Sequence, residues 1–267
     1  MAFDYQNILV EKKDRYAIVT INRPDVMNCV DVPTAKEITD AMEQLNVDPE
    51  VFGVIITGAG GKSFCAGDDV NDDWSQSPFG SAWGMRVATL PRQRMLNSIE
   101  EYSFPVIAAI DGYALGGGLC LALTCDLRIA TEKSKFGATM VRLGFHDDWG
   151  GNSKLPRVIG EAKAKELYFT GKRISAAEAE KMGMLTQVVP SSEDLLPACE
   201  ALMAEILKNA PLAIKFEKIA LHCGRNMSQK DVMEMESMMD GIVIESQDLK
   251  EGLDAFFHKR EPKWINK

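Results

Sequence analysis

The chain has 267 residues, 46% hydrophobic and 26% charged, with a formal net charge of −9 at pH 7. This is an ordinary globular composition, and the negative charge argues against nucleic acid or an anionic membrane surface as a partner. We find no apolar signal core in MAFDYQNILVEKKD, no apolar run of membrane-spanning length and no CxxC pair among the six cysteines. We therefore expect a cytoplasmic protein with reduced thiols and, because its three histidines lie far apart, no metal site.

Short β-rich runs alternate with helical runs over the first 190 residues. The sequence predicts strands at 15–22, 52–60, 104–112 and 126–137, and helices at 33–46, at about 83–101 and in the apolar run after the glycines at 116–118. Ile38, Met42 and Leu45 recur at helical spacing in the first of these helices. The alternation predicts an α/β fold, with residues 1–190 as a layered core.

The pattern changes from about residue 191 onward. Only helical runs follow, separated by short breaks, through DLLPACEALMAEILKNA, PLAIKFEKIALHC, KDVMEMESMMDGIVIES and KEGLDAFFHKR. We interpret residues 191–267 as a helical region appended to the core.

Two glycine-containing turns stand out as a candidate site. In IDGYALGGGLCLALTCD (110–126), three glycines follow a strand and open an apolar helix, whose N-terminus presents unpaired N–H groups. SFCAGDDVND (63–72) is a second such turn after a strand. Two turns that each supply one N–H group meet the minimum for an oxyanion hole. Close helix–strand packing explains the glycines equally well at this level.

These segments carry a family resemblance. FCAGDD, PVIAAIDGYALGGGLCLALTCDLRIA and KFGATMVRLGF…GG occur in that order, together with INRPDVMN, LPRVIG, FTGKRISAAEAEKMGMLTQVV and GLDAFFHKREPKW. Over nearly the whole chain the sequence resembles the crotonase (enoyl-CoA hydratase/isomerase) superfamily. The resemblance implies a spiral of ββα units with a C-terminal helical region for oligomerisation and for covering a neighbour's site, in a homotrimer or homohexamer.

The resemblance also implies a site for an acyl-CoA thioester, with coenzyme A as part of the substrate and no permanently bound cofactor. The backbone N–H groups of Asp68 and Gly117 would hold the enolate oxygen. Neighbouring substrate contacts would come from the two turns and from the aromatic residues of the loop 69–88, namely Ala66, Gly67, Asp69, Gly116, Trp74 and Trp83. By family position, the candidates for the CoA phosphates are Arg23, Lys62, Lys259 and Lys263.

The sequence departs from the family at both catalytic glutamates. In ordinary hydratases the first catalytic glutamate lies two residues after the glycine triplet. In this sequence that position is Cys120. The second position, four residues after the Phe of the FG pair, is Met140. A thioether cannot act as a base, and an unperturbed thiol with a pKa of about 8.5 is a poor substitute for a carboxylate. The standard two-glutamate hydration mechanism is therefore not expected.

FGATMVRLGFHDDWGG (136–151) offers a replacement carboxylate. The glycines around His146, Asp147 and Asp148 indicate a loop. Asp148 resembles the single acid/base of ring-fission isomerases that act on phenylacetyl-CoA derivatives, and the same region carries the nucleophilic aspartate of aryl-CoA dehalogenases. A carboxylate against apolar walls has a raised pKa and can shuttle a proton. His146 could orient Asp148, and Trp149 could wall a flat ring.

Each of these residues also has a structural interpretation. Asp147 fits a solvated or capping residue, and His146 fits a surface or packing residue. Trp149 fits the core, and Cys120 fits a small apolar filler.

We therefore expect an enoyl-CoA hydratase or double-bond isomerase for an unusual, cyclic or conjugated, enoyl-CoA, with Asp148 as acid/base. The alternative is a CoA-thioester hydrolase, ring-cleaving hydrolase or dehalogenase that uses Asp148. A third reading is a non-catalytic CoA-ester binder that lost activity with its glutamates.

Overall fold

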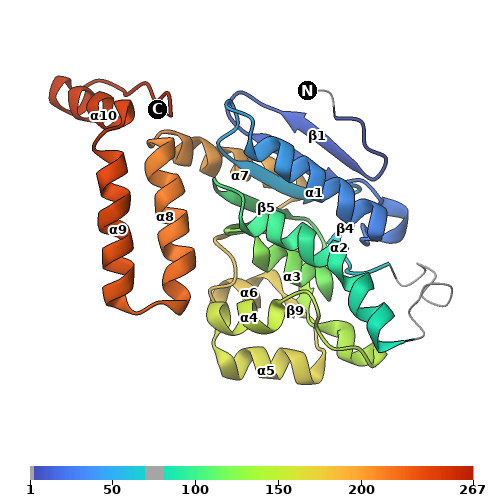
Figure 1. Ribbon diagram of the computed structural model, residues 1–267. Helices are drawn as coiled ribbons and strands as arrows, with labels where there is room; N and C mark the ends of the chain where they lie inside the picture. The colour runs from blue at the N-terminus through green and yellow to red at the C-terminus, as the bar shows by residue number, and fades with distance from the viewer. Residues whose placement is uncertain (1–2, 70–80, 267) are drawn as a thin grey trace.

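The computed structural model describes residues 3–69 and 81–266, and its centre is a six-stranded sheet (Figure 1). The strand order is β1-β2-β3-β5-β7-β10. Only β1 and β2 pair antiparallel, and every other neighbouring pair is parallel. The strands are β1 Ile8–Lys12, β2 Ala17–Ile21, β3 Val54–Gly58, β5 Val106–Ile110, β7 Leu127–Thr131 and β10 Gln187–Val189.

A second sheet of four short strands lies beside the first. It comprises β4 Ser63–Cys65, β6 Tyr113–Leu115, β8 Lys135–Gly137 and β9 Ile174–Ser175. β4, β6 and β8 each follow a strand of the large sheet directly in the chain and precede a helical segment. This repeated β-β-α order confirms the predicted α/β spiral.

The strand predictions were right in place but too coarse in detail. The predicted strand 126–137 is two strands, β7 and β8, and the chain likewise leaves β5 before it enters β6. At the second break Gly112 has φ +82, and a Cβ atom there would lie 2.0 Å from the carbonyl oxygen of Lys62. A sharp turn against a neighbouring backbone therefore ends β5 close to the predicted end at 112, and β6, which the sequence analysis did not predict, follows it.

The helices of the core pack against the two sheets and against one another. α1 (Val32–Asn46) packs against α2 (Ala82–Glu100) and buries Ile38, Met42 and Leu45, as predicted. α3 (Gly117–Thr124) is buried along its whole length, as a helix that is apolar on all sides should be. The other core helices are η1 Pro24–Val26, η3 Thr139–Leu143, α4 Gly151–Ile159, α5 Glu161–Thr170 and α6 Ala176–Lys181.

The C-terminal helices divide into one that packs on the large sheet and others that extend outward. α7 (Ser192–Leu207) buries Leu195, Cys199 and Met203 against sheet residues that include Ile55 and Ile107. α8 (Pro211–Cys223) and α9 (Gln229–Val243) lie side by side and project from the body, and α10 (Gln247–His258) follows at their end (Figure 1). We call α8, η4 (Gly224–Asn226), α9 and α10 the C-terminal arm.

The arm leaves large apolar side chains exposed, among them Met233, Met238, Ile242, Phe256 and Phe257. Within the described ranges, no helix combines the length and the apolar character needed to cross a membrane.

Candidate active site

The two glycine turns meet at the edge of the small sheet. After β4, Asp68 pairs with Val30 in an isolated parallel bridge, in which Val30 N donates to Gly67 O (2.8 Å) and Asp69 N donates to Val30 O (3.2 Å). In this pattern the N–H group of Asp68 itself faces away from Val30. Gly67 has φ +103, and a Cβ atom on it would lie 3.0 Å from Gly117 N. The turn therefore rests directly on the first residue of α3.

Glycine is needed at each of the three positions where α3 begins, for a different local reason at each. Gly116 has φ +55, which L side chains rarely adopt. A Cβ atom on Gly117 would lie 2.8 Å from the Trp149 ring, and one on Gly118 would lie 1.9 Å from Cys65 O. Close packing therefore accounts for Gly118, while Gly116 and Gly117 form the helix N-terminus that faces the other turn.

A cavity of about 100 Å³ lies where these segments meet. It collects nine of the predicted site residues: Ala66, Gly67, Asp68, Gly116, Gly117, Met140, His146, Asp148 and Trp149. Met85, Thr139, Leu143 and Phe145 complete its lining. The walls are mostly apolar, and the only carboxyl side chains among these lining residues are those of Asp68 and Asp148.

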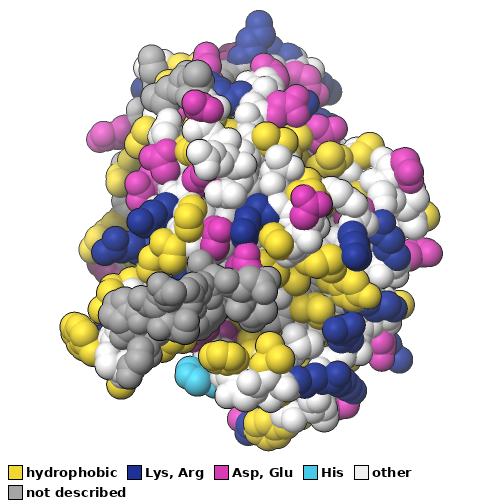
Figure 2. Space-filling model, turned by 90° about the vertical axis from the view of Figure 1, so that its right-hand side faces the viewer, with side chains coloured by type: hydrophobic (Ala, Val, Ile, Leu, Met, Phe, Trp, Pro, Cys, Tyr) yellow, Lys and Arg dark blue, Asp and Glu magenta, His cyan; other side chains and the backbone are white. Residues whose placement is uncertain are grey.

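Hydrophobic side chains also gather on the outside of the molecule where α2 begins (Figure 2). The exposed apolar residues of α2 and of the segment from η3 onward are Trp83, Val87, Leu90, Val141, Leu143 and Phe145. Leu143 and Phe145 belong to the cavity wall as well, so apolar surface continues from the cavity to the exterior.

Asp148 lies half-buried in the cavity wall, on the segment between η3 and α4. Burial raises the pKa of its carboxyl group, and the charge of Asp147 raises it further. Its own backbone N–H group, His146 and Arg92 oppose that rise in pKa. His146 is exposed, and its Nδ1 lies 2.9 Å from the carbonyl oxygen of Asp147.

Asp68 has a carboxyl group that is fixed by two other elements. Trp149 Nε1 donates to Asp68 Oδ2 (2.9 Å), and the guanidinium group of Arg92, which is buried on α2, forms an ion pair with Oδ1. Burial raises the pKa of Asp68 to about 6; the Arg92 charge opposes this and the Asp148 charge adds to it. The same residue therefore supplies a backbone N–H group and a perturbed carboxyl group.

Asp147 differs from the solvated or capping residue that the sequence suggested, because it is only 7% exposed. Oδ1 accepts from Trp149 N (2.8 Å) and Cys120 Sγ (3.4 Å), and Oδ2 accepts from Tyr168 Oη (2.5 Å). Donors from α3 and α5 thus satisfy this buried carboxyl group with hydrogen bonds, as buried polar groups require. Burial also raises the pKa of the Cys120 thiol well above its ordinary value, so the thiol stays protonated.

Some predicted site residues lie away from the cavity. Trp83 is 72% exposed and has Arg86 over its ring. Asp69 is buried and forms an ion pair with Arg23 (2.9 Å). Trp74 lies outside the described residues.

The basic residues suggested for the CoA phosphates are spread over the molecule. Arg23 is paired with both Asp31 and Asp69 close to the first turn. Lys62 is exposed immediately before β4. Lys259 and Lys263 are exposed at the end of the C-terminal arm, so within one chain the structure does not bring them to the cavity (Figure 1).

Sequence reasoning missed Arg92 and Tyr168, which hold Asp68 and Asp147. One signal was available for Arg92. It shares the buried face of α2 with Met95, Leu96 and Ile99, at helical spacing, and an arginine on an apolar face needs a partner. Tyr168 carries no comparable signal, because a partly buried tyrosine is common in proteins and does not demand a charged partner.

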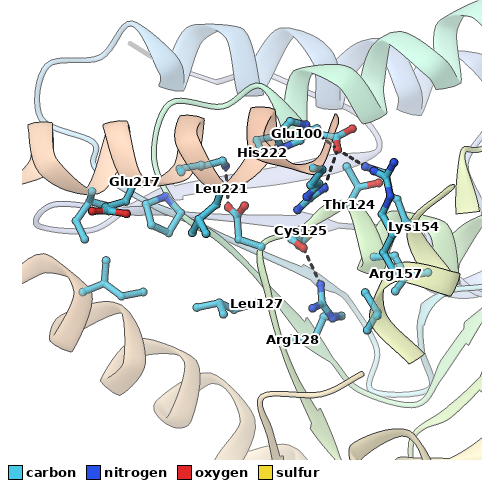
Figure 3. A pocket seen from close by; sticks show the side chains of 18 residues that line it. Glu100, Thr124, Cys125, Leu127, Arg128, Lys154, Arg157, Glu217, Leu221 and His222 are labelled. Carbon is cyan, nitrogen blue, oxygen red and sulfur yellow. Dashed lines mark hydrogen bonds and ion pairs between the residues drawn. The ribbon is translucent and has the colours of Figure 1, made fainter. Parts of the chain in front are cut away.

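A larger cavity of about 720 Å³ lies between α8 and the core (Figure 3). Several of its charged groups form ion pairs. Glu100 accepts from Lys154 and lies 3.1 Å from His222 Nε2, and Lys218 Nζ lies 2.7 Å from Asp126. The pairs of His222 and Lys218 join α8 to the core, and neither glycine turn lines this cavity.

Among the described residues, no cluster of three or more His, Cys, Asp or Glu is arranged to hold a metal ion.

Comparison with known proteins gives consistent matches along the chain. Residues 11–267 match the family model described as enoyl-CoA hydratase/isomerase. Crotonyl-CoA hydratase from Syntrophomonas wolfei is 40% identical over 98% of this chain and 99% of its own length. (E)-benzylidenesuccinyl-CoA hydratase from Thauera aromatica is 35% identical over 96% and 97%. The crystal structure of enoyl-CoA hydratase from Bacillus anthracis superposes with a TM-score of 0.93 at 35% identity, covering 98% of this chain and 100% of that chain.

Proposed function

We propose, from the premise that this chain belongs to the enoyl-CoA hydratase/isomerase family, that it acts on an enoyl-CoA thioester through an enolate, with Asp148 as the acid/base. The chain is an enzyme of the hydratase/isomerase type, and its relatives act on CoA thioesters by name. The observation that carries the proposal is the half-buried Asp148 carboxyl group in the same cavity as the two glycine turns.

The thioester oxygen would lie between the backbone N–H groups of Asp68 and Gly117. Within the described part of the chain, neither amide donates a hydrogen bond to another residue. The close approach of Gly67 to Gly117 N supports a shared acceptor position. Negative charge that develops on this oxygen is further stabilised by the N-terminus of α3.

Asp148 would move the proton. Its carboxyl group shares the cavity with apolar residues that include Met140, Phe145 and Trp149, and burial raises its pKa, which favours uptake of a proton. One carboxylate can remove a proton from one carbon of an enolisable thioester and return it to another. Met140 and Cys120 take no part in this transfer, because a thioether and a protonated buried thiol offer no base.

The names of the relatives support a conjugated acyl group. The relatives named above act, by name, on a four-carbon crotonyl group and on a benzylidenesuccinyl group. We therefore keep a conjugated or small cyclic enoyl group as the proposed substrate.

We also propose that the protein forms a homotrimer or homohexamer. The exposed apolar residues of the C-terminal arm form a surface of the kind that subunit contacts cover. In such an assembly Lys259 and Lys263 would serve the site of a neighbouring subunit. The mass of the protein in solution tests this point.

The central experiment offers the protein linear and cyclic enoyl-CoA and dienoyl-CoA esters in D₂O and follows products by mass spectrometry. We expect water addition or deuterium incorporation by the wild type, and a loss of about 10³-fold in Asp148→Asn. Circular dichroism should show that this variant is folded. Release of free CoA would favour the hydrolytic alternative, and thioester binding without any reaction would favour the non-catalytic one.

A further inference from the structure

We propose that the carboxyl group of Asp68 is a second catalytic acid, which makes this site a hydratase rather than a one-carboxylate isomerase. The proposal rests on the function proposed above and names the reaction of that same site. Hydration needs one group that takes a proton from water and another that gives a proton to the α-carbon. The residues at the two usual glutamate positions, Cys120 and Met140, supply neither.

Asp68 and Asp148 reach one cavity from two separate elements. Asp68 follows β4, and Asp148 precedes α4. The amide N of Asp68, which would bind the thioester oxygen, is bonded to the same Cα atom that carries the side chain, at about 1.46 Å. The carboxyl group therefore starts beside the thioester carbonyl and its neighbouring α-carbon. Asp148 remains for the water that attacks the β-carbon.

The Asp68 carboxyl group is held in place and still accessible. Trp149 Nε1 and Arg92 each engage one oxygen, and the side chain retains 21% of its exposure. Oδ1 is buried against Arg92, so Oδ2, which keeps a second lone pair beside the one that accepts from Trp149, is the oxygen left for a further partner. The Trp149 ring also lies against Gly117. The residue that orients this carboxyl group is thus also a wall of the oxyanion site.

The protonation of the pair suits this division of roles. Asp68 has a pKa raised to about 6, by burial first and then by the Asp148 charge, against Arg92. Two carboxyl groups that interact in this way hold one proton between them over a range of pH. In the proposal Asp68 carries that proton, and Asp148 acts as the base.

The resulting steps balance. Asp148 takes a proton from water as the water oxygen bonds to the β-carbon. The π electrons of the C=C bond move toward the thioester oxygen, which becomes an enolate held by the amides of Asp68 and Gly117. Asp68 then gives its proton to the α-carbon and the C=O bond re-forms, which yields a 3-hydroxyacyl-CoA. One proton passes from Asp148 back to Asp68, directly or through solvent, and restores the pair.

Two variants separate chemistry from positioning. Asp68→Asn keeps the backbone N–H group and an oxygen that accepts from Trp149, but it has no proton to give. Trp149→Phe keeps a ring beside Gly117 and removes the donor to Asp68. For each protein we would measure hydration of crotonyl-CoA and, separately, isomerisation of 3-butenoyl-CoA in D₂O, which needs the enolate and Asp148 alone.

We expect the ratio of hydration to isomerisation to fall about 100-fold or more in Asp68→Asn and much less in Trp149→Phe. Hydration by Asp68→Asn at the wild-type rate would overturn the proposal. So would equal losses in the two variants, which would make Asp68 a positioning residue for Trp149. A parallel loss of both activities in Asp68→Asn would also overturn it, because the defect would then lie in the shared enolate step.

The activities of the wild type distinguish the proposed role of Asp68 from the proposed function on which it rests. A wild-type protein that isomerises but never hydrates overturns the role of Asp68 and leaves the enolate mechanism standing. A wild-type protein that does neither refutes the proposed function itself.

Discussion

Asp147 and Asp148 are adjacent in the sequence and have opposite surroundings. The Asp147 carboxyl group is buried and accepts hydrogen bonds from Trp149 N, Tyr168 Oη and Cys120 Sγ. The Asp148 carboxyl group is half-buried in the cavity wall, and burial raises its pKa. The difference is one of partners: three donors from other residues satisfy the Asp147 carboxyl group, whereas burial is the largest influence on the Asp148 carboxyl group and its backbone N–H group only partly opposes the rise in pKa.

The first way to break this comparison is to remove the buried carboxyl group. Asp147→Ala leaves the Tyr168 hydroxyl, the Trp149 amide and the Cys120 thiol without their acceptor. We expect the free energy of unfolding to fall by about 3 kcal/mol, the usual range for buried polar groups that lose their partner. Urea denaturation measures this, with the exposed Asp25→Ala as a control that should change little. An equal effect in both variants would contradict the structural role.

A second variant crowds the same cluster without removing a polar group. A Cβ atom on Gly151 would lie 2.4 Å from Asp147 Oδ2, 2.5 Å from Tyr168 Oη and 2.6 Å from Cys120 Sγ. Gly151→Ala should therefore lower the free energy of unfolding by about 2 kcal/mol. Gly241→Ala is the matched control, because it lies within α9 with open space around it and should be neutral or slightly stabilising. Thermal unfolding of the two variants measures both changes, and an equal change in both would contradict the crowding at Gly151.

The ionisation of Asp68 in the cavity predicts that activity and stability both depend on pH. Asp68 has its pKa raised from 3.8 to about 6, so kcat/KM for hydration should fall about tenfold per pH unit above that value as the acid is lost. Because the folded state binds the proton more tightly than the unfolded state, the stability that Asp68 contributes is complete below 3.8 and is lost as the pH rises through about 6. Pre-steady-state rates from pH 5 to about 8, and urea titrations that begin at about pH 4 and end at about 8, test both signs. Asp68→Asn should flatten both curves, and an unchanged stability curve would refute the assignment.

The smallest expected effect concerns a single donor to the buried carboxyl group. Tyr168→Phe removes only the hydroxyl group that donates to Asp147 Oδ2 (2.5 Å). We expect a loss of about 1 kcal/mol in stability, because Asp147 retains its other donors. Calorimetry resolves a change of this size, and a stabilised protein would show that this hydrogen bond has no net value.

The sequence predicted the architecture and the turns well, because both depend on local patterns. Strand composition and glycine positions identified the segments that meet at Gly67 and Gly117, and the structure brings them together. The family resemblance singled out Asp148 by its place between Gly144 and Gly150–Gly151, and the structure places it in the cavity.

The environment of each carboxyl group could not be predicted, because it depends on partners distant in the chain. Asp147 is buried by Cys120 and Tyr168, which lie 27 and 21 residues away. The carboxyl group of Asp68 is held by Arg92 on α2 and by Trp149 in the segment before α4. Periodicity shows which side chains share a face, but it does not show which of two adjacent aspartates will meet a donor.

The most direct test compares the turnover of Asp148→Asn with that of Asp147→Asn on one enoyl-CoA substrate, at a temperature where both variants are folded. The account predicts that Asp148→Asn is slower by at least about 100-fold, since it removes the acid/base, while Asp147→Asn alters mainly stability. If Asp147→Asn is the slower of the two, or both turn over like the wild type, Asp148 is not the acid/base.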